Sequence, residues 1–308
     1  MAIHERLYSR LAAPPRSRST FPALAISRYG TRYATRGVFR KLVLFGSFAP
    51  AVIMSFGLYF VAQNEESVLR FVAQMGMGNY ASIAEVPADK AYQSLSTVLW
   101  MLLAWQGWFA TLLTPLVGAP QIADDMRSHA FEVYLARPIS RWDYFLGKLL
   151  VIMRPLLLIM VLPVVIVLGM AHGFLEGTFA STWTLYPRAF AAILVWATVN
   201  SIVILGISSM GKSARYASVI WFVVTVGSFI VASILLQATQ NSMFDLVSYN
   251  HCLFSVVINL IDLRPVVDLD LPIMDIDRGP RSSLLVLGGL CLLSTWLVMR
   301  RLRAGRLP

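Results

Sequence analysis

Six long stretches of this chain carry no charged residue, and they constrain the fold more than any other feature. The stretches are Leu42–Asn64, Ala91–Ala123, Pro155–Leu175, Ala189–Gly211, Tyr216–Phe244 and Ser282–Met299. A helix needs about 20 mostly apolar residues to cross about 30 Å of hydrocarbon. Only helices and closed barrels can span a bilayer, because every backbone N–H and C=O must be paired within the protein. The stretches have helical length and lack the ten-residue alternation of barrel strands. They therefore predict an all-α, polytopic helical membrane protein with six transmembrane helices.

The composition leaves little room for a separate soluble domain. Hydrophobic residues make up 57% of the 308 residues and charged residues only 14%. We expect a flexible basic tail over residues 1–26 and a single transmembrane domain over residues 27–303. The expected spans lie near residues 42–63, 93–117, 149–172, 189–210, 216–238 and 282–300. The uncharged segment 246–261 is too short to span comfortably, so it predicts a re-entrant outer hairpin before the last span.

The basic residues are distributed unevenly and orient the protein. Nineteen of the 26 lysines and arginines fall before the first span, after the second and fourth spans, or after the sixth. An excess of Lys and Arg marks the cytoplasmic side. The sequence therefore predicts a multi-pass protein of the cell (inner or plasma) membrane with both termini in the cytoplasm. Because the charges flank spans and do not form one patch on a soluble fold, we expect no nucleic-acid partner. No metal site is expected either.

Four arginines before the first span follow a strict four-residue spacing. They are Arg28, Arg32, Arg36 and Arg40. On one helix over residues 27–41 they would form a single basic stripe, typical of an interfacial elbow helix that lies in the headgroup plane. Each arginine would then contribute about 1 kcal/mol against anionic lipid. The alternative is an anchor that only orients the first span.

The segment Gly206–Ser213 matches the phosphate-loop pattern G-x-x-x-x-G-K-[ST]. That loop binds nucleotides where it joins a strand to a helix in an α/β domain. Here one uncharged stretch ends in the segment and another follows it closely. We therefore interpret it as a cytoplasmic turn between two spans, and we expect no nucleotide site in this chain.

The polar connection between the second and third spans carries the most specific pattern. Ile122, Met126 and Val133 recur on one face of a helix over residues 121–137. The charged residues of its opposite face are Asp124, Asp125, Arg127 and Glu132. Pro138 ends this helix, because the residue before a proline is pushed out of the helical region. Ser140 and Asp143 then have the spacing of a capping box that begins the third span.

This segment resembles the membrane subunits of type-2 ABC exporters. The residues that carry the resemblance are Leu135, Arg137, Pro138, Ile139, Ser140, Arg141, Tyr144, Gly147 and Lys148. The resemblance implies that residues 121–137 form the coupling helix, which docks into a separate ATP-binding subunit. The implied contact residues are Asp124, Asp125, Arg127, Ser128, His129 and Glu132, with His129 where the family usually has glycine. It implies that Arg137, Pro138, Ser140, Arg141, Gly147 and Lys148 link this helix to the third span.

The resemblance also implies a function. The chain would be the permease subunit of an ATP-driven exporter, paired with a second permease as a homodimer or heterodimer and with two ATPase subunits. The chain itself would not be an enzyme and would hold no cofactor, since ATP and Mg²⁺ would be bound by the ATPases. The uncharged spans favour a lipid-like, amphipathic or peptide cargo.

Three alternatives remain at this point. An ABC-type subunit could transmit force to an outer partner without moving cargo. A membrane-embedded enzyme would need a catalytic motif such as H-E-x-x-H or G-x-S-x-G, and neither occurs in the sequence. A secondary transporter normally places ionisable groups at the membrane midplane. Arg154 is the one charge in the interior of an expected span, and it is close enough to the cytoplasmic end to reach the headgroups.

The predicted topology can be tested by cysteine-accessibility labelling in intact cells. Cysteines introduced between residues 265 and 281 should react with a membrane-impermeant reagent added from outside. Cysteines introduced after residue 304 should react only after the membrane is permeabilised. The opposite pattern at either place would contradict the six-span topology.

Overall fold

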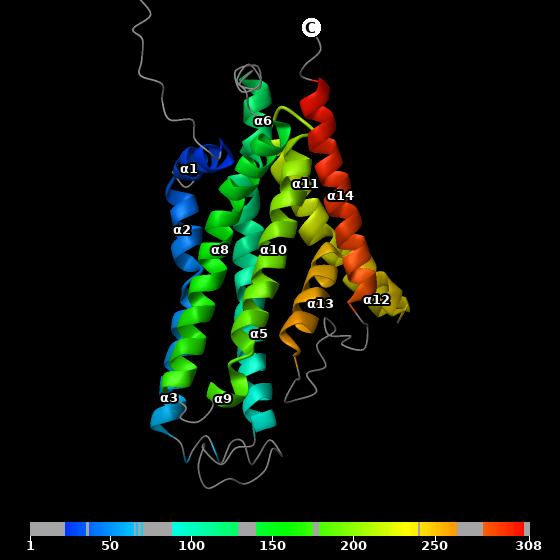
Figure 1. Ribbon diagram of the computed structural model, residues 1–308. Helices are drawn as coiled ribbons and strands as arrows, with labels where there is room; N and C mark the ends of the chain where they lie inside the picture. Colours follow the sequence, from blue (N-terminus) through cyan, green and yellow to red (C-terminus); the bar gives the residue numbers. More distant parts are fainter. Residues whose placement is uncertain are drawn as a thin grey trace, which may run out of the picture.

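The chain folds into a bundle of long helices (Figure 1). The structure is a computed structural model that describes residues 22–34, 37–64, 66, 69, 88–128, 140–174, 179–239, 241–263 and 280–304. Every regular element in these ranges is helical. The all-α fold predicted from the sequence is therefore confirmed.

Six helical segments are long and apolar enough to cross a membrane, as the uncharged stretches predict. They are Val38–Gln63, Tyr92–Arg127, Arg141–Phe174, Leu185–Ser208, Ala214–Thr239 and Arg281–Arg303. The first is built from α2 (Val38–Gly46) and α3 (Ala49–Gln63), and the second from α5 (Ala88–Gly118) and α6 (Pro120–Arg127). The third, fourth and sixth are α8 (Arg141–Phe174), α10 (Leu185–Ser208) and α14 (Arg281–Ala304).

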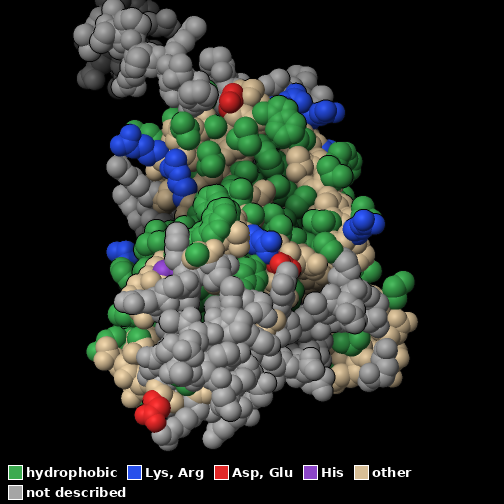
Figure 2. All heavy atoms as spheres, turned by 60° about the horizontal axis from the view of Figure 1, so that its bottom comes forward, with side chains coloured by type: hydrophobic (Ala, Val, Ile, Leu, Met, Phe, Trp, Pro, Cys, Tyr) green, Lys and Arg blue, Asp and Glu red, His purple; other side chains and the backbone are tan. Residues whose placement is uncertain are grey.

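The second, third and fourth spans form the centre of the bundle. In the most apolar stretch of each of these three spans, between 56% and 61% is buried inside the protein. The corresponding share is 17% to 28% for the first, fifth and sixth spans. The outer three spans therefore leave most of their apolar surface to be covered by lipid or by another chain. Figure 2 shows hydrophobic side chains over much of the described part of the visible face, with most Lys and Arg side chains towards its edges and one next to an acidic side chain near its centre.

The two ends of the bundle differ. Helix α1 (Pro22–Ala34), α6 and the last turns of α14 lie at one end, which we call the α6 end (Figure 1). The short helix α9 (Phe179–Thr182) lies at the other end, which we call the α9 end. The first and last described helices thus meet the same end, as an even number of spans requires.

The N-terminal basic segment departs from the single helix predicted over residues 27–41. Its helix α1 already begins at Pro22, in a segment predicted as tail, and proline is well tolerated in a first helical turn because it lacks an N–H. A turn at Gly37, with a φ of 127° that favours glycine, leads into α2. Arg28 and Arg32 therefore lie on α1 and Arg40 on α2. The predicted stripe on one helix is wrong. Arg36 lies outside the described residues.

Helix α1 packs closely across α8 because two glycines let the backbones approach. A Cβ atom at Gly147 of α8 would lie 2.8 Å from Ile26 Cβ and 3.2 Å from the Ala23 carbonyl oxygen. A Cβ atom at Gly30 of α1 would lie 2.4 Å from Val151 Cγ2. Real Cβ atoms do not approach so closely, so both positions require glycine for this packing.

The first span is interrupted at Ser47 and Phe48, between α2 and α3. Gln106 of α5 donates a hydrogen bond from Nε2 to the Ser47 carbonyl oxygen at 2.7 Å, and both residues are buried. A backbone carbonyl released by a helix break needs such a partner inside hydrocarbon. The second span therefore stabilises the break in the first.

The fifth span contains a π-helical turn, Val223–Gly227, between α11 (Ala214–Phe222) and α12 (Ser228–Thr239). The chain then passes through the 3₁₀ turn η3 (Ser242–Val247) into α13 (Tyr249–Ile261). Asn250 Nδ2 donates to the Thr225 carbonyl oxygen at 3.2 Å, and the Tyr249 N–H donates to Ser228 Oγ at 3.2 Å. The start of α13 is thus bonded to the π-helical turn. The re-entrant position of this segment in a membrane stays a prediction.

Replacing Gly147 tests the packing of α1 on α8. Gly147→Ala should lower stability by about 1–3 kcal/mol, because the added methyl group overlaps Ile26. Gly169→Ala on the same helix is a matched control, since nothing lies within 4 Å of its Cβ position. The control should leave stability unchanged or raise it by up to about 1 kcal/mol. Thermal unfolding of the purified protein measures both variants, and equal unfolding temperatures would contradict the close contact.

Candidate functional site

Helix α6 forms the described part of the predicted coupling helix. It follows α5 after Ala119 and ends at Arg127, so the structure describes residues 121–128 of the expected 121–137. Ile122 and Ala123 are buried against the bundle, whereas Arg127 and Ser128 are exposed. The amphipathic character expected from the sequence is therefore present in this part. His129, Glu132, Arg137 and Pro138 lie outside the described residues.

Asp125 connects α6 to the start of α8. Its Oδ2 lies 2.7 Å from Lys148 Nζ and accepts a hydrogen bond of 2.7 Å from the Tyr144 hydroxyl. The side chains of Lys148 and Asp125 are only 10% and 15% exposed. Tyr144 and Lys148 are one helical turn apart on α8, so both reach the same carboxylate. Asp125, which the sequence places on the polar face of α6, thus points to α8.

The other polar residues of α6 divide between buried and accessible positions: Gln121 is buried and donates to the Val117 carbonyl oxygen, whereas Arg127 is exposed. Asp124 is half-buried, and its carbonyl oxygen accepts the Ser128 hydroxyl at 2.8 Å. Met126 Sδ lies 3.5 Å from Arg301 Nε at the end of α14. Asp124, Arg127 and Ser128 therefore form the accessible polar surface of α6 among the described residues.

The predicted capping box at the start of α8 is confirmed. Ser140 donates to Asp143 Oδ2 from both its backbone N–H, at 3.2 Å, and its hydroxyl, at 2.7 Å. The Asp143 N–H in turn donates to Ser140 Oγ at 3.0 Å. The first turn of α8 is thus fixed next to Tyr144 and Lys148. Gly147 of the same motif is the contact point of α1, and Arg141 is the first residue of α8.

The phosphate-loop match joins two helices, as predicted. Gly206 to Ser208 belong to the last turn of α10, and Ser213 is the N-cap of α11. Ser213 Oγ accepts the Tyr216 N–H at 3.5 Å. A Cβ atom at Gly206 would lie 2.7 Å from Ser294 Cα on α14. This glycine therefore permits close packing of α10 on α14.

A second polar cluster lies at the α9 end and was missed by the sequence analysis. Arg188 Nη1 lies 2.9 Å from Asp262 Oδ2 and donates to the Tyr92 hydroxyl at 2.6 Å. The Tyr92 hydroxyl donates to the Ile261 carbonyl oxygen at 3.0 Å. This cluster joins α5, α10 and the end of α13. Arg188 and Asp262 each lie next to an uncharged segment in the sequence, and this position is the one sequence feature that could have indicated the cluster.

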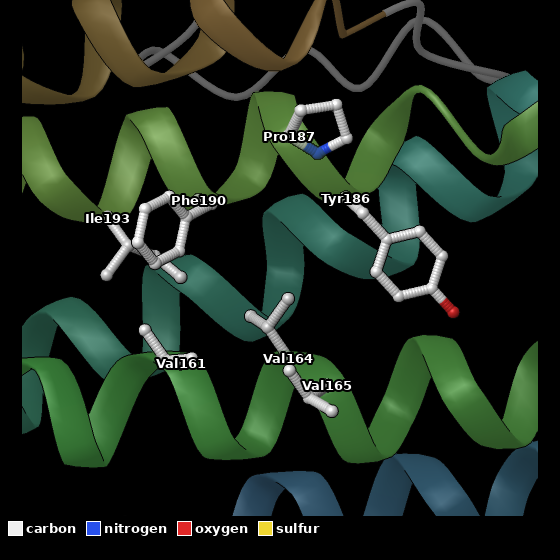
Figure 3. A pocket seen from close by; sticks show the side chains of 7 residues that line it. All are labelled: Val161, Val164, Val165, Tyr186, Pro187, Phe190 and Ile193. Atoms are coloured by element: carbon white, nitrogen blue, oxygen red, sulfur yellow. The ribbon is translucent and has the colours of Figure 1, made fainter.

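An apolar groove runs between α8 and α10 (Figure 3). Its volume is about 320 Å³. Its lining residues are Val161, Val164, Val165, Tyr186, Pro187, Phe190 and Ile193. The Tyr186 hydroxyl lies 2.9 Å from His172 Nδ1, and His172 Nε2 lies 2.6 Å from Thr182 Oγ1. These polar contacts connect α8 with α9 and α10 beside the groove.

The described residues contain no group of three or more His, Cys, Asp or Glu side chains placed to hold a metal ion.

The exposed residues of α1 include Arg28 and Tyr29, the latter 75% exposed. Helix α1 thus presents a basic and an aromatic side chain to its surroundings.

The ion pair between Asp125 and Lys148 can be tested by a double-mutant cycle. Lys148→Met alone should destabilise the protein by about 3–5 kcal/mol, because a buried carboxylate loses its cation. Asp125→Asn alone should destabilise it similarly. The double variant should recover much of the loss, since no buried charge is left unpaired. Unfolding temperatures of the four proteins give the coupling, and strictly additive losses would mean that the two side chains do not interact.

Comparison with known proteins supports the same interpretation of the bundle. No curated protein matches the chain. The sequence model described as ABC-2 family transporter protein matches residues 37–261, from the turn before α2 to the end of α13. This match covers well over half of the chain and most of the spans. The chain therefore belongs to the ABC-2 family of transporter proteins.

Proposed function

We propose that this chain, a permease subunit of an ABC transporter, belongs to an exporter and receives its driving force through α6. The main support is the anchoring of α6. One side of this short helix is buried, and its Asp125 carboxylate is bonded to Lys148 and Tyr144 of the third span. Its other side presents polar residues at the end of the bundle. A partner that moves α6 would thereby move α8.

The proposed docking surface consists of Asp124, Arg127 and Ser128, with His129 and Glu132 added from the sequence. The first three lie on α6 or directly after it, and Arg127 and Ser128 are exposed. Asp125 has a different proposed role. It positions α6 on the third span together with Lys148, and the motif residues Arg137, Pro138, Ser140 and Arg141 form the connection between the two helices.

Membership of the family supports two kinds of partner. Two separate ATP-binding subunits would hold ATP and Mg²⁺, and hydrolysis would occur there and not in this chain. ATP binding shifts the pair of permeases between two states if the ATPases contact α6 differently in each. A second permease, identical or homologous, would cover part of the apolar surface that the first, fifth and sixth spans leave exposed. The α6 end would face the cytoplasm of a cell membrane.

The elbow and cargo assignments each have specific support. Arg28 and Tyr29 are exposed on α1, which lies beside the α6 end, as a helix in the headgroup plane would require. Arg32, Arg36 and Arg40 would add to this contact with anionic lipid. The groove between α8 and α10 is lined almost entirely by apolar side chains, which favours a lipid-like, amphipathic or hydrophobic peptide cargo over an ion.

Charge exchange on α6 tests the docking proposal. The double variant Asp124→Lys with Arg127→Glu keeps the net charge and leaves the internal Asp125–Lys148 pair intact. It should express and purify normally but lose association with the ATPase. Removing one partner of a charge pair that is desolvated at an interface costs about 2–5 kcal/mol, which means a loss of affinity of at least 30-fold.

Co-purification of the ATPase subunit and the ATPase activity of the complex measure this effect. Lys41→Glu on α2 is the control, because it changes an exposed charge near the same end of the bundle without touching α6. The control should bind the ATPase as the unmodified protein does. Normal association of the α6 variant would show that its surface is merely solvated, since exposed pairs contribute only about 0–1 kcal/mol.

A further inference from the structure

Helix α6 begins without a capping side chain of its own. Ala119 precedes Pro120 and provides no side-chain hydrogen bond. The first N–H groups of a helix need partners from elsewhere, above all where they are buried. Ile122 and Ala123, whose N–H groups lie in this first turn, are 1% and 0% exposed.

The missing cap comes from a different span. Ser208, the last residue of α10, accepts the N–H groups of both Ile122 and Ala123 on its Oγ, each at 3.1 Å. The same hydroxyl donates to the Ala119 carbonyl oxygen at 2.6 Å. Ser208 is fully buried, so water does not compete for these three bonds. One side chain thereby satisfies both sides of the junction between α5 and α6.

The end of α10 that carries Ser208 is itself held in place. Gly206, two residues before Ser208, packs directly against Ser294 of α14. The connection from α6 therefore continues through α10 to the sixth span. Gly206 and Ser208 both belong to the segment that matches the phosphate-loop pattern. In this structure the Ser208 hydroxyl bonds to backbone atoms at the start of α6.

We infer that Ser208 is a positioning residue that makes α6 move together with the fourth span. This inference depends on the proposed function, in which an ATPase displaces α6. Asp125 attaches the later part of α6 to the third span, and Ser208 attaches its first turn to the fourth. With two attachments on different spans, a push on the polar face moves both spans. Without the Ser208 bonds, α6 would stay joined to the second span through Ala119 and to the third span through Asp125, but it would lose this direct bond to the fourth span.

Two neighbouring serines allow a matched experiment on the complete transporter complex in lipid nanodiscs. Ser208→Ala removes the bonds to α6. Ser209→Ala removes an equally small, buried hydroxyl whose bond, of 2.7 Å, goes to the Gly206 carbonyl oxygen of its own helix. Hydrogen exchange of residues 119–128 reports the cap in the permease itself. ATPase turnover per assembled complex reports the coupling.

Ser208→Ala should speed exchange in residues 119–128 about five-fold or more, the usual effect of losing a cap. It should also lower the turnover of the complex without lowering the amount of ATPase that co-purifies. Ser209→Ala should change neither readout. If Ser208→Ala folds poorly, Ser208→Cys keeps the volume with a weak hydrogen-bonding group and should give an intermediate result in both readouts.

Two outcomes would overturn the inference. Unchanged exchange of residues 119–128 in Ser208→Ala would show that the hydroxyl does not hold α6. Faster exchange with normal turnover would show a purely structural cap. Failure of the proposed function is distinguishable, because it appears as normal ATPase binding by the α6 charge-exchange variant or as no ATPase binding by the unmodified protein. In that case the exchange experiment still decides whether Ser208 caps α6. The proposed role of Ser208 in coupling would be rejected together with the proposed function.

Discussion

Inside a bilayer the polypeptide backbone has no water to bond to, so wherever a spanning helix is interrupted another part of the chain must supply the missing partner. Among the described residues, amide or hydroxyl side chains meet this requirement in three places. Gln106 bonds the carbonyl group of Ser47 in the first span, Asn250 bonds that of Thr225 in the fifth, and Ser208 bonds the first turn of α6. In each case the partner belongs to another helix. The interruptions thus connect helices as well as bend them.

The junction at α6 combines this backbone requirement with a buried charge pair. Taking Asp125 and Lys148 out of water is costly, and two well-packed apolar residues would often be at least as stable. The pair gives α6 a defined direction relative to α8, which an apolar contact does less well. Tyr144 supports it by donating to the same carboxylate. Charges on the two sides of α6 therefore lie in different surroundings: Asp125 is paired inside the bundle, whereas Asp124 and Arg127 are accessible.

The sequence predicted the features that depend on local composition. Uncharged stretches located the six spans because hydrocarbon excludes charge along a whole helix, and the Ser140–Asp143 capping box was predictable because its partners are three residues apart. The direction of Asp125 was not predictable, since its partner Lys148 comes from the next helix. The contact between Arg188 and Asp262 joins residues 74 positions apart. The helix boundary between α1 and α2 depends on the positive φ of Gly37. The four-residue spacing of the surrounding arginines gave no sign of this break.

Helix α13 is fastened at both of its ends. Its first residues bond to the π-helical turn of the fifth span, and its last carbonyl group and Asp262 bond to Tyr92 and Arg188 of the second and fourth spans. Helix α12, by contrast, leaves the bundle beyond that turn (Figure 1). A shift of the second and fourth spans would therefore move α13 as well. The strain of such a movement would then fall on the 3₁₀ turn η3 and on α12, so the second half of the fifth span is where we would expect the fold to deform.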